Sequence, residues 1–78
     1  MTNTVKLKKA IRDTGLLLSA IMKALNIKSY STMRRKINNE IGFNAEEIMI
    51  LCELLHLDNE QREQIFFAKE TELNSVSA

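Results

Sequence analysis

The chain has 78 residues, of which 45% are hydrophobic and 5% aromatic, and it contains two glycines and no proline. A chain this short holds a single core, and the scarcity of turn residues argues against a meander of short strands, so we expect one all-α domain. The net charge is only +1. No apolar run approaches the roughly 20 residues of a membrane span, and the first residues do not form a secretory signal, which predicts a soluble, cytoplasmic protein without a membrane partner.

Apolar residues at four-residue spacing predict the first two helices. The first covers about residues 5–13 and ends at Gly15. The second covers about residues 16–25 and ends at Asn26, a residue type that adopts the left-handed conformation which closes a helix.

A third helix is expected from Tyr30 to about Asn39, because Tyr30, Met33 and Ile37 fall on one face and predict its core side. On a helical wheel the opposite side is small, polar and basic. The residues that point away from the core face are Ser31, Thr32 and Arg35. The residues that flank it are Arg34 and Lys36.

Two capping boxes predict where the last two helices begin. They are Asn44 with Glu47 and Asp58 with Gln61, and they open helices over about residues 45–56 and 59–72. Residues 1–73 therefore form the expected domain, and residues 74–78 a flexible C-terminal tail.

Charge is divided unequally along the chain. Residues 1–38 carry nine basic residues and one acidic residue, a net +8, whereas residues 39–78 carry two basic and nine acidic residues, a net −7. A positive field on one side of a small domain favours binding to a nucleic acid over charge that serves solubility alone.

Three stretches carry a resemblance to a known family: Gly15-Leu16 through Ile27, Thr32 through Asn38, and Gly42 through Ile48. Together with residues 64–68 they resemble the lambda-repressor and Cro family of phage regulators, over roughly residues 5–70. The resemblance implies a compact five-helix lambda-repressor-like helix-turn-helix domain. Its expected function is that of a sequence-specific transcriptional regulator, a phage or prophage repressor that binds operator DNA as a homodimer through the major groove.

The resemblance also implies roles for individual residues. Four positions match those that read base edges, namely Tyr30, Ser31, Arg34 and Arg35. Four others match positions at or near phosphates, namely Lys28, Thr32, Lys36 and Asn38. The chain departs from the family where Gln, a small Ala and Gly are common, since it has Leu18, Met22 and Asn26 there.

These departures leave a second hypothesis open, a protein-interaction module on the same fold, such as an antirepressor, an antitoxin or a phage-encoded inhibitor. The missing Gln, the acidic second half and the cluster Leu16 to Leu18, which cannot all point inward, favour it. Adjacent Phe66 and Phe67 cannot both be central to the core, and an exposed phenylalanine there would suit the homodimer interface of a regulator.

Catalysis is not expected. The chain has no Ser-His-Asp pattern and no glycine-rich phosphate loop. Cys52 and His56 lie four residues apart but are too few ligands for a zinc site. We therefore expect no metal, cofactor or small-molecule substrate.

Overall fold

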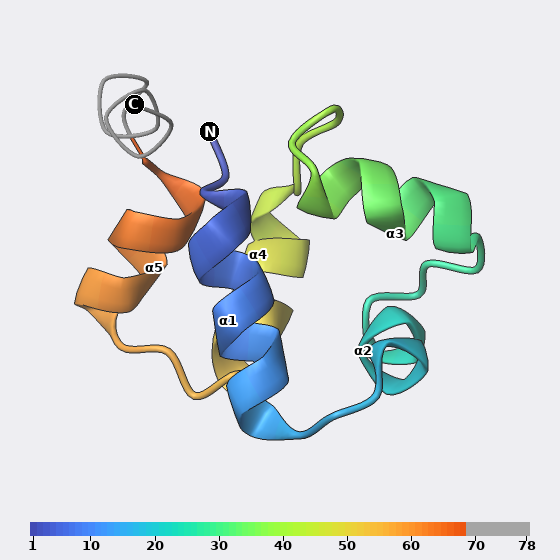
Figure 1. Ribbon diagram of the computed structural model, residues 1–78, viewed down its shortest axis with the longest axis horizontal. Coiled ribbons are helices and arrows are strands. Elements are labelled where there is room, and N and C mark those ends of the chain that lie inside the picture. The colour runs from blue at the N-terminus through green and yellow to red at the C-terminus, as the bar shows by residue number, and fades with distance from the viewer. Residues whose placement is uncertain (69–78) are drawn as a thin grey trace.

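The computed structural model describes residues 1–68, and within this range the chain forms helices and no strands (Figure 1). This confirms the all-α class. The helices are α1 (Thr4–Thr14), α2 (Leu18–Ala24), α3 (Tyr30–Ile37), α4 (Ala45–Leu54) and α5 (Asn59–Phe66). None of these helices has both the length and the apolar character needed to cross a membrane. The expected tail at residues 74–78 lies outside the described residues.

Local capping explains where the helices begin. Both predicted capping boxes are confirmed at the starts of α4 and α5, with the side chain and backbone of each pair bonded reciprocally. The cap of α3 was not predicted: the Ser29 side chain accepts a hydrogen bond from the backbone N–H of Thr32. These caps satisfy N–H groups that have no partner within the helix.

Left-handed residues close two of the connections as expected. Gly15 ends α1 with φ 73°, and Asn26 has φ 58° in the connection after α2. Ile27 follows it and packs partly buried against the core. The connection between α2 and α3 is thereby fixed to the body of the protein.

Four helix bounds differ from the predictions by two residues or more, and one of them is the end of α3, which lies at Ile37 and not at Asn39. α2 begins at Leu18, because Leu17 before it is extended with ψ 144°. α4 ends at Leu54, two residues before His56, whose φ of 53° is left-handed. α5 ends at Phe66 and not at residue 72, since Phe67 leaves the helical conformation with φ −123°.

The helices surround one core. α1 runs through the middle of the molecule, with α5 on one side of it and α2 and α3 on the other, while α4 lies behind α1 (Figure 1). α1 packs against both α3 and α5, and α2 packs against α4. Four side chains from four different helices are fully buried, namely Leu7, Ile21, Met33 and Leu51.

The N-terminal segment is bound to both sides of the fold. Thr2 and Asn3 are buried, although both are polar. Backbone bonds join Asn3 N to Ile65 O at 2.6 Å and Ala68 N to Met1 O at 3.0 Å. On the other side, Thr2 N donates to Asn39 Oδ1 at 3.1 Å, and Thr4 Oγ1 donates to Ile37 O at 2.7 Å. Residues 1–4 thus connect the C-terminal ends of α3 and α5.

Candidate nucleic-acid interface

α3 is attached to the core along one side only. Met33 is fully buried and Ile37 is 7% exposed, so these two side chains fix the rotation of the helix about its axis. The remaining faces of α3 are then determined by the 100° step between helical residues.

The exposed side of α3 gathers the four predicted base-reading residues, because Tyr30, Ser31, Arg34 and Arg35 are all exposed. Asn38, the C-cap residue of α3, is exposed next to them. The face therefore combines two guanidinium groups with one small side chain, one amide and one phenol.

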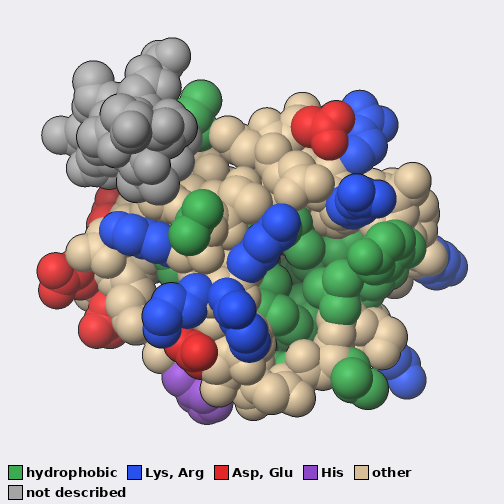
Figure 2. Space-filling view, in the orientation of Figure 1, with side chains coloured by type: hydrophobic (Ala, Val, Ile, Leu, Met, Phe, Trp, Pro, Cys, Tyr) green, Lys and Arg blue, Asp and Glu red, His purple; other side chains and the backbone are tan. Residues whose placement is uncertain are grey.

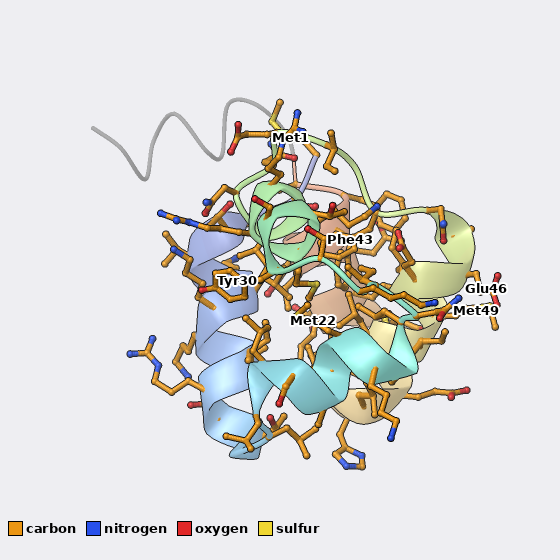
Figure 3. All side chains as sticks on the ribbon, turned by 90° about the vertical axis from the view of Figure 1, so that its right-hand side faces the viewer. Met1, Met22, Tyr30, Phe43, Glu46 and Met49 are labelled. Atoms are coloured by element: carbon orange, nitrogen blue, oxygen red, sulfur yellow. The ribbon has the colours of Figure 1, made fainter. Side chains whose placement is uncertain are left out.

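Tyr30 does not belong to the core. The prediction that it shares the core face with Met33 and Ile37 is wrong, since its side chain is 61% exposed. It is the first residue of α3, and its ring lies toward α1 and not among the buried side chains (Figure 3). On the helical wheel Tyr30 lies at the edge of the apolar face, which explains the wrong prediction.

Lys36 is turned away from the exposed side of α3. Its Nζ lies 3.0 Å from Glu47 Oε1 and donates to the carbonyl oxygen of Gly42 at 3.0 Å. The same Nζ lies 5.7 Å from the centre of the Phe43 ring. With its side chain only 14% exposed, Lys36 ties α3 to the start of α4, so it does not lie with the exposed residues of α3.

The other residues predicted to contact phosphates differ in how exposed they are. Lys28 is exposed in the connection between α2 and α3. Asn38 is exposed at the end of α3, whereas Thr32 is half-buried on the side of the helix away from α1. Lys28 and Asn38 are therefore the members of this set that a ligand reaches freely.

A groove lies where α3 meets α1 and α2. It encloses about 320 Å³ and has an apolar floor with basic residues around it. Figure 2 shows this hydrophobic patch between Lys and Arg side chains. The lining residues are Lys8, Ile11 and Arg12 of α1, Leu18 of α2, and Tyr30, Arg34, Ile37 and Asn38 of or beside α3.

Lys8 and Arg12 were not among the predicted site residues. Both are exposed on α1, more than 20 residues before the end of α3, and only the packing of α1 against α3 brings them to the groove. The surplus of basic residues before Asn39 was the sequence signal that pointed to them. They extend the positive surface of α3 onto a second helix.

A second, larger groove lies between α4 and α5 and encloses about 720 Å³. Its lining is mainly apolar and includes two large hydrophobic side chains that are exposed, Met49 at 64% and Phe67 at 52%. Phe66 beside it is only 3% exposed, so the prediction that one of these two phenylalanines is central to the core is confirmed. In Figure 3, Met49 lies at the right-hand edge of the view, away from Tyr30 near its middle.

The groups with potential for other chemistry are dispersed. Cys52 lines the second groove as a free thiol, and burial raises the pKa of this thiol, so it is protonated at neutral pH. Within residues 1–68, no three His, Cys, Asp or Glu side chains are grouped so that they could hold a metal ion.

No protein-family model, curated protein sequence or solved structure matches the chain. The function must therefore be inferred from the α3 face and the two grooves.

Proposed function

We propose that this protein is a sequence-specific DNA-binding transcriptional regulator, in which α2 and α3 form a helix-turn-helix unit and α3 enters the major groove. The observation that carries the proposal is the exposed side of α3 with Ser31, Arg34 and Arg35, of which Arg34 lines a groove together with Lys8 and Arg12 of α1. Basic side chains on two packed helices suit a polyanion.

Each part of this surface has a distinct task on DNA. An α-helix such as α3 is about 10–12 Å across with its side chains, so it fits the width of the major groove. Ser31 lets the backbone approach the bases, and the two guanidinium groups reach guanine N7 and O6. Lys8 and Arg12 lie to the side, where they neutralise phosphates, as Lys28 does from the connection before α3.

The regulator is proposed to act in the cytoplasm as a phage or prophage repressor, and a homodimer would match a two-fold operator. The footprint of such a dimer on its operator would show two symmetric half-sites.

Selection from a random duplex library, followed by fluorescence anisotropy at several salt concentrations, tests the proposal. We expect an enriched sequence whose affinity falls steeply with salt as phosphate counterions are released.

Arg35→Ala is expected to weaken this binding by about 1–3 kcal/mol and to relax specificity. Lys9→Ala is the matched control, since Lys9 is exposed but paired with Asp13 outside the groove, and should change affinity little. Equal affinity for selected and random DNA would refute the proposal.

A second candidate function is a protein-interaction module, and the groove between α4 and α5 is the observation that favours it. Exposed apolar surface of this kind marks protein contacts. If this function holds, a tagged chain should retain a defined protein from a nuclease-treated host lysate, and Phe67→Ser should abolish that retention. Tyr30→Ser is the control in the groove beside α3, and loss of the retained protein with this variant alone would assign the contact to the basic face instead.

A further inference from the structure

We propose that Tyr30 and Leu18 form an apolar notch which reads the 5-methyl group of a thymine in the bound DNA. This inference rests on the proposed function and names the base that the interface selects. It depends on the groove beside α3, whose floor is apolar although its surroundings are basic.

The notch is built from the first residues of two helices. Tyr30 opens α3 and Leu18 opens α2, and both line the same groove together with Ile11 and Ile37. Tyr30 is 61% exposed, while Leu18 is half-buried and packs against the core. An exposed aromatic ring and a half-buried leucine thus line the same groove, at the end of α3 nearest the connection from α2.

The charges around the notch determine what occupies it. Lys8 and Arg12 approach from α1, and Arg34 from α3, so among residues 1–68 three cations and no carboxylate line the groove. A polyanion covers such a groove with favourable Coulomb energy. DNA is therefore the occupant whose negative charge matches the three cations around the groove. One of its base edges then faces the apolar floor.

Thymine is the base whose major-groove edge matches this floor. Guanine, adenine and cytosine present hydrogen-bond donors or acceptors in the major groove, whereas thymine adds a methyl group to its one acceptor. A polar base edge pressed against Leu18 would lose its water without gaining a partner, which is unfavourable. The methyl group loses water favourably on contact with the leucine and the tyrosine ring.

Single replacement of each thymine by deoxyuridine in the selected duplex tests the inference, because this change removes the methyl group and keeps every hydrogen-bonding group. For the wild-type protein we expect one position per half-site at which affinity falls about fourfold, the value for one buried methyl-sized group. Tyr30→Ala should bind the thymine duplex more weakly and show no further loss with deoxyuridine. Tyr30 is exposed, so this variant should fold normally, which circular dichroism verifies.

Arg35→Ala is the matched control and should retain the full deoxyuridine effect while binding more weakly overall. The inference is overturned if every thymine tolerates deoxyuridine in the wild-type protein, or if the effect persists in Tyr30→Ala. Both of these outcomes leave sequence-specific binding intact. Failure to select any sequence would instead refute the proposed function itself, so the two failures are distinguishable.

Discussion

Replacing Glu47 with alanine is expected to lower the free energy of unfolding by about 3 kcal/mol, as is typical when one partner of a buried ion pair is removed. The Glu47 side chain is only 11% exposed, and its Oε1 accepts from Lys36 Nζ at 3.0 Å and from Asn44 N at 2.9 Å. The substitution therefore leaves a largely buried ammonium group without its carboxylate and also removes half of the capping box of α4.

Urea denaturation followed by circular dichroism measures this loss. Glu46→Ala is the control, since Glu46 lies beside Glu47 in the first turn of α4 but is exposed. The double variant Lys36→Met and Glu47→Leu should recover much of the stability, because it replaces the ion pair by apolar groups of similar size. If Glu47→Ala and Glu46→Ala are equally stable, the ion pair does not hold α3 against α4.

Met33→Ala is expected to destabilise the protein by about 2–5 kcal/mol, through lost apolar contacts and the cavity that remains. Met33 is fully buried and is one of the two side chains that attach α3 to the core. A small domain is stable by only about 5–15 kcal/mol, so a large fraction of the chains could unfold at 37 °C. DNA binding should weaken in proportion, although Met33 does not face the DNA.

Thermal and urea denaturation measure the loss for Met33→Ala, with Met33→Leu as the control. Leucine keeps the volume and apolar character of methionine, so this variant should cost less than about 1.5 kcal/mol. Equal destabilisation by leucine and alanine would mean that the shape of the methionine chain, and not burial at this position, determines the stability of α3.

The sequence predicted those parts of the fold that depend on neighbouring residues. The two capping boxes and the closing residues Gly15 and Asn26 act within a few residues of their own position, so their pattern identifies them directly. Ser29 was missed as a cap because Tyr30 beside it was taken for the start of an apolar face. Helix ends such as that of α5 depend on contacts of the chain beyond the helix, and a periodic pattern does not show them.

The candidate site was predicted only where it lies on one helix. The exposed side of α3 follows from its helical wheel, whereas the partner of Lys36 is a carboxylate 11 residues further along the chain. In the sequence, a lysine within a run of basic residues looks the same whether its side chain faces DNA or a buried glutamate. Lys8 and Arg12 reach the groove through tertiary packing, and their contribution likewise depends on how α1 crosses α3.

The bonds from Met1 and Asn3 to Ala68 and Ile65 have a consequence for synthesis of the protein. During synthesis the partners of the N-terminal segment at the end of α3 appear first, whereas Ile65 and Ala68 appear only after more than 60 further residues have been made. Contacts this distant in sequence form late, because the loop between them must close first. We therefore expect the N-terminal segment of a nascent chain to bind the end of α3 before it binds the end of α5.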